Sequence, residues 1–191
     1  MSRARRLVAL APYLLGALFV AGIVHIVAVL IMPRYAPRDA FARLQEWGGV
    51  NELALPPANA GERPPFLDPA LQIAVCRFDV SQGPVRVSAT VDGEHLLSMA
   101  FQSRTGQIFH SLTDRAALRQ RIDVVLLQKD DLEALQAEDS DEETPNELRL
   151  TPPTPTGLVI VRALAATTGA RAAAQDQLRK VRCAAEISPR L

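Results

Sequence analysis

The sequence predicts an α+β protein, in which an N-terminal transmembrane helix precedes a mostly antiparallel β-sheet domain with a C-terminal helix packed on it. Three observations predict this fold class: a long uncharged apolar run near the N-terminus, a central stretch of alternating apolar and polar residues, and an apolar stripe at helical spacing near the C-terminus. Four segments follow from these patterns: an N-terminus in the cytoplasm (1–6), a transmembrane helix (7–32), a Pro-rich tether with a short helix (33–70) and an outer α+β domain (71–191).

The apolar run, Leu7–Met32, contains 26 residues and no Asp, Glu, Lys or Arg. About 20 such residues cross the hydrocarbon core of a membrane as a helix. A cleavable signal peptide is the alternative, but its apolar region spans about 7–15 residues and leads to a small-x-small cleavage site. Because this run is longer and ends in Ile31-Met32-Pro33, we expect a signal-anchor that stays on the mature protein.

Arginines on the two sides of the run predict its orientation. Arg3, Arg5 and Arg6 precede it, whereas Arg34 and Arg38 follow it. The side with more positive charge tends to stay in the cytoplasm. We therefore expect the N-terminus inside the cytoplasm and the tether and domain outside it.

Four residues within the run are candidates for contact with another membrane helix: Ala17, Ala21, His25 and Ala28. The three alanines share one face, and small residues let membrane helices approach each other closely. An imidazole inside a membrane is a functional-site hypothesis by default. The alternative is a plain tether, in which His25 only shares a hydrogen bond with a neighbour.

The charge balance and the motif content limit the functions of the outer domain. The chain has 21 basic and 21 acidic residues, but five of the basic ones precede Asp39 and no acidic residue does. The remainder therefore carries a net charge of about −5, which disfavours nucleic acid as a partner. The sequence has no GxSxG, HExxH or CxxC motif and no Gly-rich phosphate loop, so we predict neither an enzyme nor a bound cofactor.

The tether is rich in proline, with seven of the 14 prolines in residues 33–70. A short helix is predicted over residues 40–47, with Phe41 and Leu44 on one face. This helix either lies along the membrane or covers the domain. Residues 51–69 are predicted to be an extended spacer.

The first half of the domain predicts a four-stranded antiparallel meander over residues 72–112. Apolar and polar residues alternate there, as they do in strands with one buried face. Gln82-Gly83-Pro84, Asp92-Gly93 and Arg104-Thr105-Gly106 are the predicted turns, because glycine adopts the positive φ that tight hairpins need. A fifth strand, residues 122–127, is apolar enough to be central.

The second half predicts a helix over residues 129–137, a strand pair over 147–150 and 157–164, and a final helix over 170–182. The final helix has an apolar stripe that can pack on the sheet: Ala174, Leu178, Val181 and Ala185.

An acidic segment, residues 138–147, separates two of these elements and is predicted to be a solvated loop. Asp139, Asp141 and Glu143 alternate like the first ligands of a calcium loop. The pattern lacks the glycine and the closing glutamate of such a loop, so no calcium site is predicted.

The two cysteines, Cys76 and Cys183, are predicted to form a disulfide, since a pair outside the cytoplasm is best explained in this way. On a regular helix Cys183 points about 160° away from the apolar stripe, so the helix would have to loosen near Arg182. Zinc bound by both cysteines with His95 and His110 is the alternative. No pair among them has zinc-like spacing, so no metal is predicted.

Four polar residues near predicted strand ends are candidates for a binding surface: His95, His110, Asp114 and Arg115. The alternative is an ordinary turn, with a local salt bridge between Asp114 and Arg115.

Several short motifs of the domain resemble one bacterial family, the short membrane-anchored proteins of domain of unknown function twelve fifty-four. The motifs are Cys76-Arg77-Phe78-Asp79, Gly83-Pro84-Val85-Arg86-Val87 and Ser111-Leu112-Thr113-Asp114-Arg115, together with the late Cys183. The resemblance covers about residues 65–185 and fits the N-terminal anchor, but Leu96-Leu97-Ser98 stands where the family has a Trp. It implies a bacterial inner (plasma) membrane protein with a periplasmic domain, and a partner from a sister uncharacterised family. It supplies no catalytic residues.

The predicted function is therefore that of a single-pass membrane protein whose periplasmic domain binds a partner protein or an envelope component. Two alternatives stay open at this point. One is an enzyme or small-ligand sensor whose periplasmic site is built from residues outside known motifs. The other is a membrane subunit that acts through its transmembrane helix.

Overall fold

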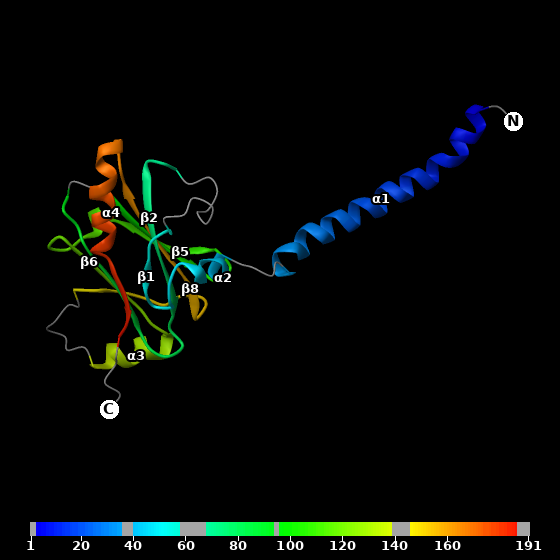
Figure 1. Cartoon of the computed structure of the whole chain (residues 1–191). Helices are drawn as coiled ribbons and strands as arrows, with labels where there is room; N and C mark the ends of the chain where they lie inside the picture. The colour runs from blue at the N-terminus through cyan, green and yellow to red at the C-terminus, as the bar shows by residue number, and fades with distance from the viewer. Residues whose placement is uncertain (1–2, 36–39, 58–67, 94–95, 139–145, 187–191) are drawn as a thin grey trace. The chain divides into compact units, whose positions relative to one another are not determined.

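The computed structural model describes residues 3–35, 40–57, 68–93, 96–138 and 146–186 (Figure 1). The chain divides into an N-terminal unit that ends at Arg38 and a C-terminal unit that begins at Asp39. Each unit is described by itself. The α+β fold class predicted from the sequence is confirmed.

The N-terminal unit is one long helix, α1 (Arg3–Tyr35). Its central part, Leu10–Met32, is 23 residues long with a mean hydropathy of 2.8, which is long and apolar enough to cross a membrane. A signal sequence meets the same criterion, so retention of the helix and its orientation stay predictions. The predicted helix is confirmed and extends beyond both ends of residues 7–32.

The C-terminal unit contains two β-sheets (Figure 1). The five-stranded sheet is antiparallel throughout, in the order β1 (Leu53–Ala54), β2 (Leu71–Asp79), β8 (Thr156–Leu164), β4 (Leu97–Ser103) and β5 (Ile108–Thr113). The four-stranded sheet has the order β7 (Leu148–Leu150), β6 (Arg121–Leu126), β3 (Val85–Thr90) and β9 (Arg182–Ala185), with β6 and β7 parallel.

The core lies between these two sheets. Alternate side chains of each strand enter it, among them Phe78, Leu97 and Phe101 from the five-stranded sheet and Val87 and Val124 from the other. All five are buried, as expected for the inner faces of a sandwich. Short helices complete the unit: α2 (Ala40–Arg43), η1 (Leu44–Glu46), η3 (Asp114–Ala116), α3 (Lys129–Glu138), η4 (Thr168–Ala170) and α4 (Arg171–Arg179).

The predicted four-stranded meander over residues 72–112 is wrong, although its strands exist. Strands β2 and β3 belong to different sheets, and so do β3 and β4; only β4 and β5 form a hairpin. Gln82-Gly83-Pro84 and Asp92-Gly93 therefore connect the two sheets instead of closing hairpins. A sandwich and a meander produce the same alternation, because both bury one face of each strand.

The predicted strand pair over 147–150 and 157–164 is also wrong in its partners. Strand β7 pairs in parallel with β6, and β8 inserts between β2 and β4. The central place of β8 explains its apolar sequence, since Val159 faces the core and Leu158 is buried on the opposite face. Strand β6 is interior to its sheet, as predicted for residues 122–127.

The short helix predicted over residues 40–47 covers the domain. Phe41 packs with Val75 and Leu158 on the outer face of the five-stranded sheet, where Leu44 and Trp47 join them. The guanidinium of Arg77, on β2, lies 5.2 Å from the centre of the Phe41 ring and donates a 2.7 Å hydrogen bond to the Gly48 carbonyl. These contacts hold α2 and η1 on the sheet.

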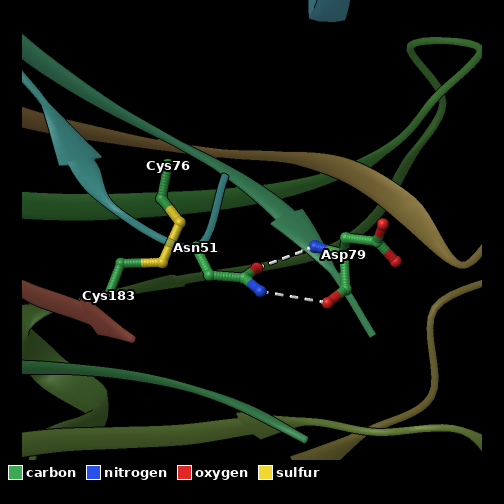
Figure 2. Close-up of a disulfide and its surroundings, with 4 residues drawn as sticks. All are labelled: Asn51, Cys76, Asp79 and Cys183. Carbon is green, nitrogen blue, oxygen red and sulfur yellow. Dashed lines mark hydrogen bonds between the residues drawn. A yellow bond between two sulfur atoms is a disulfide. The ribbon is translucent and has the colours of Figure 1, made fainter. Parts of the chain in front are cut away.

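The predicted extended spacer over residues 51–69 contains a strand that was not expected. Strand β1 pairs with β2, in the register Leu53↔Cys76. Asn51 precedes it: its side-chain oxygen accepts a 2.8 Å hydrogen bond from the Asp79 N–H, and its amide donates a 3.2 Å bond to the Asp79 carbonyl (Figure 2). The Asn51 side-chain amide thus bonds both backbone groups of Asp79, as a residue of a paired strand would do.

The final helix predicted over residues 170–182 is too long. Helix α4 ends at Arg179. Strand β9 begins at Arg182 and pairs antiparallel with β3. Val181, between the two elements, is buried in the core. Helix α4 packs against β2 and β8, so the prediction of a C-terminal helix on the sheet is confirmed.

This change of element explains how the two cysteines meet. Cys183 lies on strand β9 opposite Val87, and its side chain is buried. It forms a disulfide with Cys76 on β2, with the two Cα atoms 6.4 Å apart (Figure 2). The predicted disulfide is confirmed in the structure, and it joins the two sheets. No loosened helix end is needed, since residue 183 is not helical.

Candidate binding groove along strand β5

Each sheet ends in two edge strands, and these differ in length. Strand β1 has 2 residues, β7 has 3, β9 has 4 and β5 has 6. An edge strand presents unpaired backbone N–H and C=O groups that another strand can bind. A very short edge strand has few such groups, so β5 presents the largest number of unpaired backbone groups among these edge strands.

Strand β5 also lacks the usual protection of an edge. It contains no Lys, Arg, Asp, Glu or Pro, whereas β7 carries Arg149 and β9 carries Arg182. An irregularity opposite Phe101 and Gln102 disturbs its first residues, and residues 110–113 then pair regularly with β4. In the part of the chain that the structure describes, no backbone hydrogen bond reaches the far edge of β5.

An open groove with a volume of about 660 Å³ runs along this regular part. We call it the β5 groove; it is lined by residues 110–113 of β5, residues 98–100 of β4, Arg115 and Ala116 of η3, Leu148 of β7, and Arg162 of β8. It thus combines an exposed strand edge with side chains from both sheets.

The lining of the β5 groove is basic. It includes His110, Arg115 and Arg162 and contains no Asp or Glu. Neither guanidinium makes an ion pair or hydrogen bond within the described ranges, whereas those of Arg86 and Arg149 are ion-paired. Free guanidinium groups bind carboxylates and phosphates with paired, charge-assisted hydrogen bonds. The groove is therefore suited to an anionic group.

Apolar side chains line the other part of the groove. Leu148 is 39% exposed, and Leu112 is half-buried against the core. The β4 register places Ser98 opposite both Arg162 and Thr113, so these three share a row on the outer face of the sheet. The pleat places Leu112 on the opposite, core-facing side.

The four residues predicted as a binding surface are only partly gathered. His110 and Arg115 line the β5 groove. Asp114 lies beside Arg115 on η3, outside the lining, and its buried Oδ1 has no hydrogen-bond partner among the described residues. His95 lies outside the described residues, as do Asp139, Asp141 and Glu143 of the acidic segment.

Sequence reasoning missed Arg162 and Leu148. Arg162 is the one charged residue in the apolar strand β8, and that contrast was a usable signal. Its neighbours across β4 follow from the sheet order, which the sequence did not reveal. The described residues contain no cluster of three or more His, Cys, Asp or Glu that could hold a metal ion.

The four candidate contact residues of the membrane helix lie on α1. Ala17, Ala21, His25 and Ala28 are all exposed in this unit. Their contact with another helix stays a prediction.

A second polar cluster lies on the outer face of the four-stranded sheet. Arg86 on β3 binds Asp123 on β6 through Nη1 at 2.7 Å, Glu147 beside β7 through Nη2 at 2.7 Å, and Glu186 beside β9 through Nε at 2.6 Å. Arg149 binds Glu147 at 3.0 Å. Each nitrogen of the Arg86 guanidinium has a carboxylate partner, so this cluster joins the strands of its sheet.

The ion pairs of this cluster shift two pKa values. Burial acts to lower the pKa of Arg86, but hydrogen bonds to Glu186, Asp123 and Glu147 outweigh it and raise that pKa. Burial acts to raise the pKa of Glu147, but hydrogen bonds from Arg149 and Arg86 outweigh it and lower that pKa below its ordinary value. Both groups are therefore held in their charged forms.

Comparison with known proteins gives similarity of fold alone. No family model and no curated protein matches the chain. The crystal structure of the VPA0106 protein from Vibrio parahaemolyticus is similar, with 12% identity and a TM-score of 0.54, over 74% of this chain and 32% of that one. An uncharacterised protein from Burkholderia cenocepacia has 15% identity and a TM-score of 0.44, over 77% of this chain and 40% of that one. This chain therefore spans well under half the length of either protein.

Proposed function

We propose that this chain is a single-pass membrane protein whose folded domain binds a partner protein at the β5 groove. The observation that carries the proposal is the six-residue edge strand β5, unprotected and lined by two arginines without ion-pair partners in the described chain. Edges that are left open in this way are used for binding other chains.

The shape of the groove favours a macromolecule over a small ligand. Sites for small molecules are concave and bury about 70–90% or more of the ligand surface. The β5 groove is open and follows a strand edge, so it would leave a small ligand largely in water. This supports binding of a protein over the enzyme or small-ligand sensor.

The proposed location is the inner membrane of a bacterium, with the domain in the periplasm. The apolar span of α1 and the arginines before it support the anchor and its orientation. The disulfide between Cys76 and Cys183 supports an oxidising compartment, where such bonds form and persist.

The partner proposed is a protein that works beside this domain, of the sister family that the sequence resemblance implies.

Photo-crosslinking in cells tests the proposal. A photoreactive residue at Ser111 or Thr113, both exposed on β5, is expected to give one discrete adduct with another protein. The same residue at Ala173, exposed on α4, is the control and is expected to give none. The adduct should disappear when Arg115 and Arg162 are both changed to Glu. Equal crosslinking at all three positions, or none at β5, would contradict the proposal.

A further inference from the structure

We infer that the β5 groove binds its partner as an extended peptide that bears carboxylates and adds a sixth strand to the five-stranded sheet. This inference rests on the proposed function and specifies its mode and its chemistry. Three features carry it: the backbone edge of β5, the basic outer side of the groove, and its apolar inner side.

The backbone edge determines the conformation of the bound segment. Residues 110–113 pair regularly with β4 on one side, and no described residue bonds their backbone on the other. An added strand satisfies these groups with its own N–H and C=O groups, which supplies affinity without regard to side chains. At about 3.3 Å per residue, four to six residues of the partner would lie along this edge.

The two sides of the groove determine the side chains of the bound segment. Arg115 follows directly after β5, and Arg162 lies on the outer face of the sheet two strands from that edge, so the outer side of the groove attracts carboxylates of the added strand by its positive charge. Leu112 and Leu148 lie toward the core side, where apolar side chains would be taken up. Because successive residues of a strand point to opposite faces, the expected pattern alternates acidic and apolar residues.

A second copy of this chain is the other possible occupant, through pairing of two β5 edges. Such pairing would bring Arg115 and Arg162 of both copies to one interface, with no acidic side chain in the groove to balance them. Like charges brought together in an interface disfavour association. Charge complementarity therefore favours an acidic peptide.

Peptide binding to the full-length protein in detergent micelles tests the chemistry. The probe is a fluorescent ten-residue peptide in which Glu alternates with Val, and its binding is measured by fluorescence anisotropy. We expect the matched Lys–Val peptide to bind at least tenfold more weakly. The double variant R115E/R162E should reverse this preference, whereas R171E/R182E, with the same charge change at two exposed arginines outside the groove, should keep it.

Backbone methylation tests the mode. Two further Glu–Val peptides carry N-methyl groups on alternate residues, one set at odd and one at even positions. An added strand turns only one of these sets toward β5, so one peptide should lose at least tenfold in affinity and the other should bind like the parent.

Three results would overturn the inference: equal binding of the Glu and Lys peptides, the same effect of both methylated sets, or absence of peptide binding. A dimer that pairs through its two β5 edges would assign the edge to a second copy and would also overturn the inference. If the crosslink at Ser111 persists while these peptides fail, the inferred mode is wrong and the proposed partner binding still stands.

Discussion

Arg86 forms ion pairs with three carboxylates that lie on or beside three neighbouring strands. Its three carboxylate partners lie on or beside β6, β7 and β9, so one guanidinium ties together all four strands of its sheet. Its side chain is 31% exposed, and that of Asp123 is 15% exposed. Ion pairs in such half-buried positions are screened less than those on the surface.

Replacing Arg86 with Met is expected to destabilise the domain by about 2 kcal/mol, between the values for exposed and buried ion pairs. The loss arises because three carboxylates are left close together without their shared cation. Urea denaturation of the protein measures it. Arg121→Gln is the control: Arg121 binds Asp123 at 3.1 Å but its side chain is 59% exposed, so the change should cost less than ~1 kcal/mol. Equal costs would contradict this role of Arg86.

The lowered pKa of Glu147 predicts a loss of stability in acid. A carboxyl group whose pKa is lower in the folded state stabilises the fold above its unfolded pKa, and this contribution is lost as the pH falls through the folded pKa. The melting temperature should therefore fall when the pH drops below about 4.3, the ordinary value for Glu. In Glu147→Gln the melting temperature should be lower at neutral pH and should fall less in acid. If the melting temperatures of the natural protein and of Glu147→Gln changed with pH in the same way, Glu147 would not be the group responsible.

At the level of elements, strand β8 depends on one glycine. Gly157 lies opposite Phe78 on β2 and Ser103 on β4. A Cβ at this position would meet the Phe78 ring at 2.5 Å and would also clash with the carbonyl oxygen of Gln102. The strand can take its central place only because residue 157 has no side chain.

Gly157→Ala is expected to cost about 1–3 kcal/mol, as overpacking does in close-packed cores. The matched control is Gly169→Ala in η4, where the nearest atom to an added Cβ is Thr167 Oγ1 at 4.0 Å. That variant should differ from the natural protein by less than ~0.5 kcal/mol. The melting temperatures of the two variants, measured under the same conditions, test this prediction. Equal melting temperatures would refute the role of Gly157.

The division of the C-terminal segment into α4 and β9 shows how far periodicity predicts an element. Ala174 and Leu178 have the helical spacing that was expected, and both are buried. Val181 continues that spacing but lies beyond the helix, where it fills the core. An apolar residue in the expected phase is therefore compatible with a change of element, because the core accepts its side chain from either backbone.

For the molecule as a whole, the disulfide between Cys76 and Cys183 joins the two sheets and closes a loop with a sequence separation of 107 residues. A bond that closes a long loop restricts the unfolded chain strongly. The double variant C76A/C183A should be less stable by about 2–5 kcal/mol. Reductant should lower the urea midpoint of the natural protein and leave that of the double variant unchanged. A midpoint of the natural protein that does not respond to complete reduction would contradict this prediction.

The proposed anchor and its orientation are tested on the same scale. The full-length protein should stay in the membrane fraction after alkaline washing, and the mature N-terminus should still carry residues 1–6. A cysteine-free background with one cysteine placed at Gln175, exposed on α4, should react with a membrane-impermeant thiol reagent in intact spheroplasts. Reaction only after lysis would place the domain in the cytoplasm, and a mature chain that begins after the apolar span would show a cleaved signal sequence.

Part of the candidate site could be predicted from local sequence. His110, on β5, and Arg115, just after it, are close in the chain, so their proximity did not depend on the fold. Arg162 and Leu148 join them from distant strands, β8 and β7. Their place depends on the insertion of β8 beside β4 and on the parallel pairing of β7 with β6, which no local pattern encodes.

By itself the sequence determined what depends on neighbouring residues: the uncharged span of α1, the strands other than β1 and β9, the helices near residues 40–47 and 129–137, and the presence of two cysteines that can pair. The tertiary structure alone decided which strands are partners, that β9 follows α4 and that β1 lies within the Pro-rich tether. It also decided that β5 is a long edge beside two arginines that have no ion-pair partner among the described residues. Periodicity records only that one face of an element is buried. The partner that buries it is chosen by packing between residues far apart in the chain, and the edge strands are those that this packing leaves unpaired.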